Sequence, residues 1–478
     1  MRLWRVGWAL GLAFAAAVLV AGGIFYGLVE LLDFKEIDST AKLDAKTLFD
    51  LVKLSFGVVA GAGALVALVV AYRRQRVDEA GAHREATRLH TERFSQAIDK
   101  LGSDSPAVRL GGVHALAGLA DDAPDDNLRQ TCIDVLCAYL RLPFPPDPGD
   151  LPDPLPNGTS PTNEQRDAHQ DKMDMCRALR EVRHTVLRLI GDHYRIPQGT
   201  HRSWQGCDLD LTGVTIDGSI DFRGATFSGS SVSFSRATFS GSSVSFHGAT
   251  FSGSSVSFHG ATFSGGEVSF DHATFSGSEV FFSRATFSGS SVSFGDATFS
   301  GGEVSFTNAT FSDGWVSFHG ATFSDGTVFF NYAGFSGGEV SFGYAAFSGG
   351  EVSFRNAAFS GGEVVFGGAR FSGGEVSFGY AAFSGGQVVF GGATFSGGEV
   401  SFGSATFSGG QVIFGDATFS GGEVIFGGAT VLGGATFSGG TVDFTSTTGP
   451  APAGLLAAAG TPVPPEVRLR ADWLPAGP

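Results

Sequence analysis

The second half of the chain repeats a pattern of apolar and small polar residues every twelve positions. Across residues 225–444 about eighteen near-copies follow one another, each with an Ala-x-Phe and a Val-x-Phe core, as in ATFSGSSVSFHG from Ala237. Within each core the apolar residues alternate with Ser or Thr, and a period of two residues predicts a β-strand. Ser- and Gly-rich segments separate the cores and are typical of turns. The pattern therefore predicts very short strands that coil into a solenoid.

The coils must stack on one another, because one coil cannot bury its own Phe and Ala side chains. A coil of about twelve residues would give a flattened solenoid with two sheets, whereas a coil of about 24 residues would be four-sided. The later copies alternate in pairs: Glu363, Gln387 and Gln411 lie 24 positions apart, and each precedes two aliphatic residues and a Phe. We therefore expect a coil of about 24 residues, made of two copies, and a coil of one copy is the alternative.

The repeats resemble those of pentapeptide-repeat proteins, in which a small residue stands two positions before a Leu or Phe. Ala237-Thr-Phe239-Ser-Gly and Val244-Ser-Phe246-His-Gly are similar to two such units, and every second unit carries an insertion of two residues, such as Ser242-Ser243. The resemblance implies a right-handed parallel β-solenoid. Whole bacterial proteins with a two-span membrane anchor and helices before degenerate pentapeptide repeats are also similar in layout. Some members of the family look like duplex DNA in shape and charge and bind DNA gyrase.

Charge and cysteine content argue against two kinds of function, direct binding of nucleic acid and binding of a metal. The net charge of −16 argues against a protein that binds nucleic acid directly. Residues 208–443 hold nineteen acidic residues against five arginines and no lysine, which leaves a net charge of −14 in the repeats. The four cysteines form no CxxC pair and have no ligand spacing, so we expect reduced, buried thiols and no metal site.

The N-terminal region predicts a membrane anchor. Residues 7–32 and 54–72 are apolar almost throughout, and each run is long enough to span a bilayer. A signal peptide is the alternative for the first run. Arg2 and Arg5 precede the first run, and Arg73, Arg74 and Arg76 follow the second, so we expect both termini and the repeats to be cytoplasmic in a multi-pass protein of the cell membrane.

Between the anchor and the repeats the sequence predicts helices. The segment SPAVRLGGVHALAGLADD, from Ser105, resembles a HEAT-type helical repeat, and residues 164–194 have an amphipathic helical pattern. We expect the latter helix to cover the first coil near Leu209 and Leu211, and Trp473-Leu474 to cover the last coil. The predicted parts are residues 1–72, a two-helix membrane anchor; 73–142, a cytoplasmic helical module; 143–163, a proline-rich linker; 164–204, a helical cap; 205–448, the solenoid; and 449–478, a Pro/Ala-rich tail.

No residue of the chain is predicted to be catalytic, to bind a cofactor or to bind a metal. The histidines of the repeats share a turn position with Gly, Arg, Asp, Asn and Tyr, a variety that indicates a solvated turn; they are His247, His259, His272 and His319. A column of Glu before the Val of many copies is explained by solubility and protection against edge pairing. A column of Thr is explained by β-propensity on an outward face.

The sequence therefore predicts a non-enzymatic, membrane-anchored scaffold that presents a solenoid surface to a protein partner, with no small-molecule substrate and no cofactor. An acidic DNA mimic that binds gyrase or another DNA-binding protein is one alternative. An exported cell-surface spacer, which requires the opposite topology, is the other.

Overall fold

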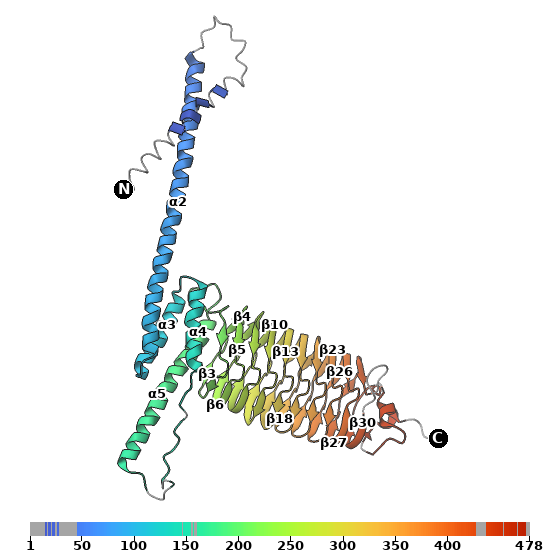
Figure 1. Ribbon diagram of the computed structural model, residues 1–478. Coiled ribbons are helices and arrows are strands. Elements are labelled where there is room, and N and C mark those ends of the chain that lie inside the picture. Colours follow the sequence, from blue (N-terminus) through green and yellow to red (C-terminus); the bar gives the residue numbers. More distant parts are fainter. Residues whose placement is uncertain are drawn as a thin grey trace. The chain divides into compact units, whose positions relative to one another are not determined.

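The structure is a computed structural model, shown in Figure 1, and the chain forms two compact units, Met1–Leu89 and His90–Pro478. The described residues are 45–145, 147–153, 156, 160–426, 436–452, 454–465 and 467–474, together with nine residues between Ala15 and Gly27. Of residues 436–440 only the backbone is described.

Helix α2 (Ala45–Leu101) begins in the first unit and ends in the second. It joins the apolar run 54–72 and the polar stretch 73–101, which the predicted boundaries placed in separate parts, into one helix without a break. Contacts between residues three or four apart support its polar part, such as Gln75 to Glu79 at 2.9 Å and Arg88 to Glu85 at 2.8 Å.

The two predicted membrane-spanning helices are not supported. In the residues that the structure describes, no helix has both the length and the apolar character that a bilayer span requires. The first predicted span, residues 7–32, lies outside the described residues except for nine positions. The second, residues 54–72, is part of α2.

Helices α3 (Pro106–Asp121) and α4 (Asp126–Arg141) pack together through buried side chains. Pro106 occupies the first turn of α3, where its missing N–H costs nothing. The carboxylate of Asp125 accepts a 2.9 Å hydrogen bond from the Leu128 amide and so caps α4. Val113, Leu116, Ile133 and Leu136 are fully buried between the helices.

Helix α5 (Asn163–Tyr194) closes the N-terminal end of the solenoid (Figure 1). The Tyr194 ring lies 5.1 Å from the ring of Phe227, and its hydroxyl donates to the Cys207 carbonyl at 2.6 Å. Gly191 allows this approach, since a Cβ there would lie 2.5 Å from the Asp221 carbonyl oxygen. Helix α4 also takes part: the Gln130 side chain pairs with both backbone groups of Asp208, at 2.8 and 2.9 Å, as a neighbouring strand would.

The solenoid consists of two parallel sheets, here sheet A and sheet B. Sheet A contains β1 (Leu209–Asp210), β4 (Thr226–Ser228), β5 (Ser231–Ser233), β7 (Thr250–Ser252), β8 (Ser255–Ser257), β10 (Thr274–Phe281), β13 (Thr298–Ser305), β16 (Thr322–Phe329), β19 (Ala346–Phe347), β20 (Glu351–Ser353), β23 (Arg370–Ser377), β26 (Thr394–Ser401), β28 (Thr418–Phe419) and β29 (Glu423–Ile425). Sheet B contains β2 (Thr215–Ile216), β3 (Ile220–Asp221), β6 (Thr238–Ser245), β9 (Thr262–Ser269), β11 (Thr286–Ser288), β12 (Ser290–Ser293), β14 (Thr310–Phe311), β15 (Gly314–Ser317), β17 (Gly334–Phe335), β18 (Glu339–Ser341), β21 (Ala358–Phe359), β22 (Glu363–Val365), β24 (Ala382–Phe383), β25 (Gln387–Val389), β27 (Thr406–Ile413), β30 (Thr436–Asp443) and β31 (Val467–Arg468).

The strand register confirms the coil made of two copies. Phe275 pairs with Phe299 in sheet A, and Phe239 pairs with Phe263 in sheet B. The result is a right-handed β-solenoid of about ten turns, with about 24 residues in each turn. The alternative of one copy per coil is wrong, because the turn after each Val-x-Phe carries the chain into the other sheet and not back to its own.

The four expected sides merge in pairs into two sheets. In β13 the strand runs without interruption through the Gly-Gly insertion, whereas β14 and β15 are the two halves of an interrupted strand. Between β13 and β16 the register shifts on both sides of Ser300, whereas β10 and β13 pair through the insertion without a shift. The two extra residues therefore join two sides of the coil into one strand in some coils and separate them into two strands in others.

Stacked phenylalanine rings fill the solenoid. Phe306 lies 4.8 Å from Phe282 and 4.7 Å from Phe330 with interplanar angles of 3°, and it meets Phe318 edge to face at 5.7 Å. These side chains have no exposed surface. A buried Phe contributes about 1.5–3 kcal/mol from burial, and favourable ring pairs add about 0.5–1.5 kcal/mol. The aromatic ladders are thus the main stabilising element.

The C-terminal tail covers the last coil. Strand β31 pairs with β30, and helix α6 (Leu455–Ala459) contacts β30. Trp473, in the 3-10 turn η2 (Ala471–Trp473), is buried and lies 5.9 Å from the ring of Phe444 and 6.4 Å from that of Phe419.

The repeat pattern is interrupted at Ala429-Thr-Val-Leu-Gly-Gly-Ala435, and this copy lies outside the described residues, which stop at Phe426 and resume at Thr436. The strands that flank it pair Thr406 with Thr436, whereas the preceding coil pairs Ala382 with Thr406. This coil is therefore longer than the one before it by six positions.

Candidate protein-interaction surface

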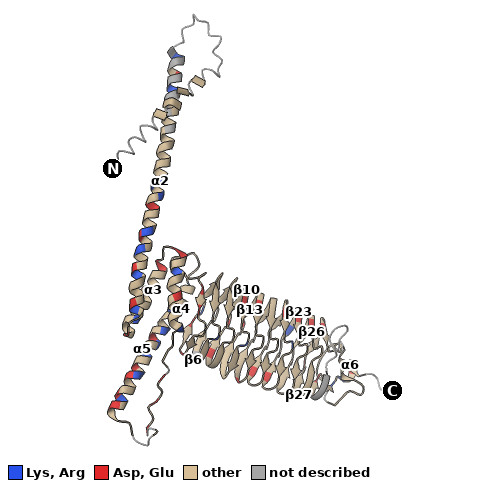
Figure 2. Cartoon of the chain, viewed as in Figure 1, with Lys and Arg blue, Asp and Glu red and all other residues tan. Residues whose placement is uncertain are grey.

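The outward face of sheet A carries a row of carboxylates. Glu351, Glu375, Glu399 and Glu423 occupy the same position in successive coils and are direct neighbours across the sheet. Adjacent parallel strands lie about 4.8 Å apart, so these like charges are held close together. Burial raises the pKa of Glu399, and the adjacent carboxylates of Glu375 and Glu423 raise it further. Figure 2 shows acidic residues along the solenoid and most of the basic residues on the helices.

We expect Glu399→Gln to stabilise the protein by about 0.5 kcal/mol at neutral pH and low salt, because it removes repulsion from both neighbours. The raised pKa means that ionisation is less favourable in the folded chain than in the unfolded one. The destabilisation is therefore present at neutral pH and disappears as the pH falls through the carboxyl range. Chemical denaturation of wild type and variant between about pH 7 and pH 4 measures this difference.

Glu267→Gln is the matched control. Glu267 lies in sheet B between Ser243 and Ser291 in register and has no acidic neighbour in the ladder. Its replacement should leave stability and its pH dependence unchanged. A Gln pair is already native to sheet B, where Gln387 donates to Gln411 at 3.1 Å. Equal effects of the two variants would contradict repulsion along the row.

Tight turns at both edges of the solenoid hold their third residue in the left-handed region. In the turn that begins at Phe330, the Ala333 amide donates to the Phe330 carbonyl at 3.1 Å, and Tyr332 has a φ of +58°. Tyr344 and Tyr380 have φ values of +56° and +59° at equivalent positions. Such a conformation costs a bulky residue about 1–3 kcal/mol, and Gly occupies the same position at Gly260 and Gly368 without that cost.

These three tyrosines are the only ones in the repeats, and all are exposed, Tyr332 at 61%, Tyr344 at 69% and Tyr380 at 44%. Tyr332 and Tyr380 lie on the edge where sheet A leads into sheet B, whereas Tyr344 lies on the opposite edge. The guanidinium of Arg355 stacks over the Tyr380 ring at 5.3 Å. We call Asn331, Tyr332, Arg355, Asn356 and Tyr380 the tyrosine edge.

Sequence inspection missed the tyrosine edge, although a signal was present. Each repeat tyrosine occupies the second of the two variable turn positions, where small or polar residues otherwise stand. Trp315, on the outward face of sheet B between Ser291 and Glu339, was missed as well and is 39% exposed. Exposed Tyr, Trp and Arg side chains are typical of residues that dominate protein interfaces.

The other residues that the sequence singled out do not form a site. His247 and His272 lie 5.1 Å apart at one edge, and His319 lies 5.4 Å from Tyr344. Within the described part of the chain, no group of three His, Cys, Asp or Glu side chains is arranged to hold a metal ion. The Thr column, for example Thr274 and Thr298, is half-buried on the outward side of the strands.

The cysteines are buried free thiols. Burial raises the pKa of Cys132 and Cys137 to about 12 and that of Cys207 to about 11. These thiols are therefore protonated at neutral pH and are poor nucleophiles.

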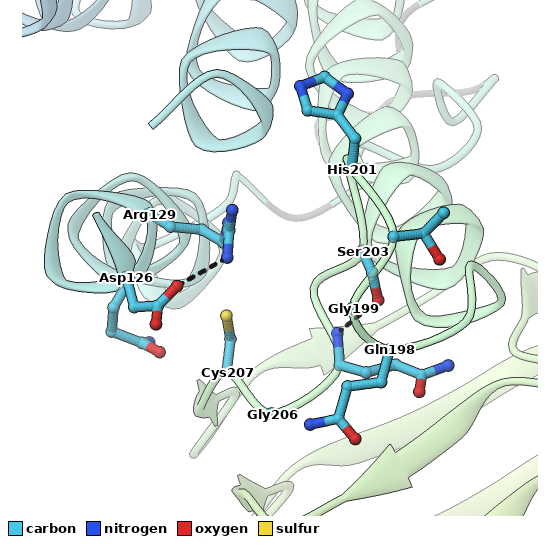
Figure 3. A pocket seen from close by; sticks show the side chains of 11 residues that line it. Asp126, Arg129, Gln198, Gly199, His201, Ser203, Gly206 and Cys207 are labelled. Atoms are coloured by element: carbon cyan, nitrogen blue, oxygen red, sulfur yellow. Dashed lines mark hydrogen bonds and ion pairs between the residues drawn. The ribbon is translucent and has the colours of Figure 1, made fainter. Parts of the chain in front are cut away.

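A cavity of about 540 Å³ lies between the start of α4 and the loop before β1 (Figure 3). Its polar groups are largely engaged within the protein: Arg129 pairs with Asp126 at 2.9 Å, Ser203 donates to the Ile196 carbonyl at 2.7 Å, and Gln205 donates to the Tyr194 carbonyl at 2.9 Å. Because these groups already have partners and the Cys207 thiol is protonated, the cavity has few free polar groups that could bind a ligand.

A buried polar network at Asp121, which no sequence pattern indicated, ties the helices to this loop. The Asp121 carboxylate accepts from Arg202 at 2.9 Å, from the Trp204 indole at 3.0 Å and from His193 at 3.1 Å. The His193 and Trp204 rings stack at 4.1 Å. Burial alone would raise the pKa of Asp121, but the hydrogen bonds from His193 and Arg202 outweigh it and lower the pKa.

We expect Asp121→Asn to destabilise the protein by about 1.5–3 kcal/mol at neutral pH, because charge-assisted bonds to buried donors are lost. Since the folded pKa is lowered, the stabilisation by Asp121 is present above the unfolded value and is lost as the pH falls through the folded one. Denaturation curves from about pH 7 to pH 3 should converge at the acidic end. Asp122→Asn, at an exposed neighbour, is the control; if it were equally destabilising, the network would not be the cause.

Comparison with known proteins identifies repeats of a known family in the solenoid. A family model described as pentapeptide repeats (9 copies) matches residues 234–280 and 270–322. No curated protein matches the chain, and no solved structure does. The matched residues lie inside the β-solenoid, and their Phe and Ala or Val side chains are buried. Residues 234–322 of the chain are therefore pentapeptide repeats.

Proposed function

We propose that this chain is a non-enzymatic scaffold whose solenoid presents a rigid surface to a protein partner. The observation that carries the proposal is the set of exposed aromatic side chains held in strained turns, Tyr332, Tyr344 and Tyr380, on a solenoid with a fully packed core. Exposure to solvent does not explain a bulky residue at a position where Gly fits better, whereas recognition of a partner explains it.

Chemical crosslinking followed by affinity purification tests the scaffold. The full chain should capture a partner that a variant without residues 205–448 does not. A second variant, which keeps the solenoid but carries Tyr→Asn changes at all three exposed positions, should lose the partner while it retains the β-rich circular dichroism spectrum. Capture that is independent of residues 205–448 would contradict the proposal.

Membrane attachment through the N-terminal unit, with both termini and the repeats in the cytoplasm, is part of the proposal. Its support is the apolar surface of α2, where Leu65, Leu68 and Val70 are 60–68% exposed, followed by Arg73 and Arg74. Exposed apolar side chains in such number need a cover. The protein should resist extraction with alkaline carbonate, and a reporter at the C-terminus should be active only in the cytoplasm. An active exported reporter would support the cell-surface spacer instead.

A second candidate is an acidic DNA mimic, and the observation that favours it is the carboxylate row on sheet A. Duplex DNA carries about one charge per 1.7 Å of its axis, whereas the row carries one per coil of about 4.8 Å. The lower density makes this the weaker candidate. The purified protein should inhibit DNA supercoiling by gyrase if it acts in this way, and no effect at micromolar concentration would remove the candidate.

A further inference from the structure

We propose that the tyrosine edge and the adjacent carboxylate row together bind a basic, proline-rich protein segment in the polyproline II conformation. This inference rests on the proposed scaffold function and names the chemistry of its partner. Three features of the described residues support it: the spacing of two exposed rings, the amide between them and the charge beside them.

The spacing of the two rings matches one turn of polyproline II. Tyr332 and Tyr380 are two coils apart, and the phenylalanines that precede them in the same turns stack at 4.8 Å (Phe330 on Phe354) and 4.9 Å (Phe354 on Phe378). The two tyrosines are therefore separated by about 9.7 Å along the solenoid, which is the sum of these two steps. A polyproline II helix rises about 3.1 Å per residue with three residues per turn, so its ridges repeat about every 9.3 Å.

The residue between the two rings suits the backbone of such a ligand. Asn356 stands at the equivalent turn position of the intervening coil, also with a φ of +58°. Polyproline II has no internal hydrogen bonds, so its carbonyls are free to accept from a side-chain amide. Aromatic ridges that flank polar donors are the general means by which proteins hold proline-rich segments.

The edge is preorganised. Asn331 accepts from the Ser353 hydroxyl at 2.7 Å and from the Arg355 amide at 3.1 Å, which fixes the turn between the two tyrosines. Arg355 in turn stacks on the Tyr380 ring at 5.3 Å and holds it in place. The rings stand on turns whose backbone is paired with the coils on either side, so little conformational freedom is lost on binding.

The charge beside the edge selects a basic ligand. Glu351 and Glu375 lie on the strands of sheet A that lead into these turns, four residues before Arg355 and five before Tyr380. Their mutual repulsion favours any cation placed between them. Prolines on the rings and Lys or Arg side chains over the carboxylates would satisfy both features. The carboxylates would repel an acidic segment, and Arg355 is the one cation among the residues of the tyrosine edge.

Fluorescence anisotropy with labelled synthetic peptides tests the inference on the full-length protein. The probe is a twelve-residue peptide with two Pro-x-x-Pro turns and three arginines. We expect it to bind, and we expect Tyr332→Asn with Tyr380→Asn to weaken binding about tenfold or more. Asn is native to this turn position at Asn308 and Asn356, so the variant should fold. Tyr344→Asn, at the opposite edge, is the control and should leave binding unchanged.

Two further comparisons test the contribution of proline and the contribution of charge separately. A peptide with Ala in place of each Pro should bind at least about fivefold more weakly, and Glu351→Gln with Glu375→Gln should weaken binding of the basic peptide at low salt. No binding at millimolar peptide, equal binding of the Ala peptide, or equal effects of the variants at the two edges would each overturn the inference. A partner captured through residues 205–448 but indifferent to Tyr332→Asn would leave the scaffold in place and remove only this site.

Discussion

Replacing Phe306 by Ala is expected to lower the free energy of unfolding by about 3–5 kcal/mol. Phe306 has no exposed surface and touches the rings of Phe282 and Phe330 above and below it and those of Phe294 and Phe318 beside it. Truncation leaves a cavity that the backbone cannot close, because the coils on both sides are fixed by the strand ladder. Urea denaturation gives the total loss, and hydrogen exchange should show that lost protection centres on the neighbouring coils.

Phe281→Ser is the matched control for this prediction. Phe281 is half-buried on the outward side of β10, and its partners in register in the adjacent coils are Ser257 and Ser305. Ser therefore already fits the position, and the change should cost about 1 kcal/mol or less. If the two substitutions had similar effects, the inward ladder would not be the main source of stability.

Replacing Gly350 by Ala is expected to cost about 3 kcal/mol or more. Gly350 has a φ of +68°, and a Cβ there would lie 2.3 Å from the carbonyl oxygen of Gly326 in the preceding coil. The left-handed conformation alone costs Ala about 1 kcal/mol, and the clash with backbone adds the rest, because the neighbouring coil must move to relieve it. Thermal and urea denaturation both measure the loss.

Gly392→Ala separates the two contributions. Gly392 has almost the same φ, +66°, but no atom lies within 4 Å of the position its Cβ would take. The change in the unfolded chain is the same for both substitutions, so the difference in stability isolates the contact between coils. Equal destabilisation would mean that the bends do not stack as closely as the structure has them.

The repeat core was predictable because its pattern is local. Ala-x-Phe and Val-x-Phe alternate with polar residues, and the pairing of Gln387 with Gln411 was visible as a sequence alternation before it was a register. The same reasoning failed where distant residues decide the outcome. Nothing near Gln130 indicates that its amide completes the first strand at Asp208, and nothing near Asp121 indicates that its partners include Arg202 and Trp204, far along the chain.

The candidate surface was less predictable than the fold. In the sequence, Tyr332 is one of several different residues at a variable turn position, and that variety indicates a solvated turn. The structure adds the backbone conformation, which makes Tyr costly there, and the contact between neighbouring coils in which Arg355 stacks on Tyr380. Contacts between coils combine residues from separate repeats, so a column inspected along the sequence does not reveal them.

The distance between two outward positions six coils apart tests the stacked coil most directly. Thr262 and Thr406 occupy the same position in sheet B, and the ring spacing of 4.9 Å between Phe263 and Phe287 represents one coil step. Spin labels at Thr262→Cys and Thr406→Cys, with the four native cysteines replaced, should give a narrow distance distribution by double electron–electron resonance. Six such steps predict a distance of about 29 Å. A distance of about 59 Å would mean one repeat copy per coil, and a broad distribution would mean that no regular solenoid forms; either result would contradict the stacked coil.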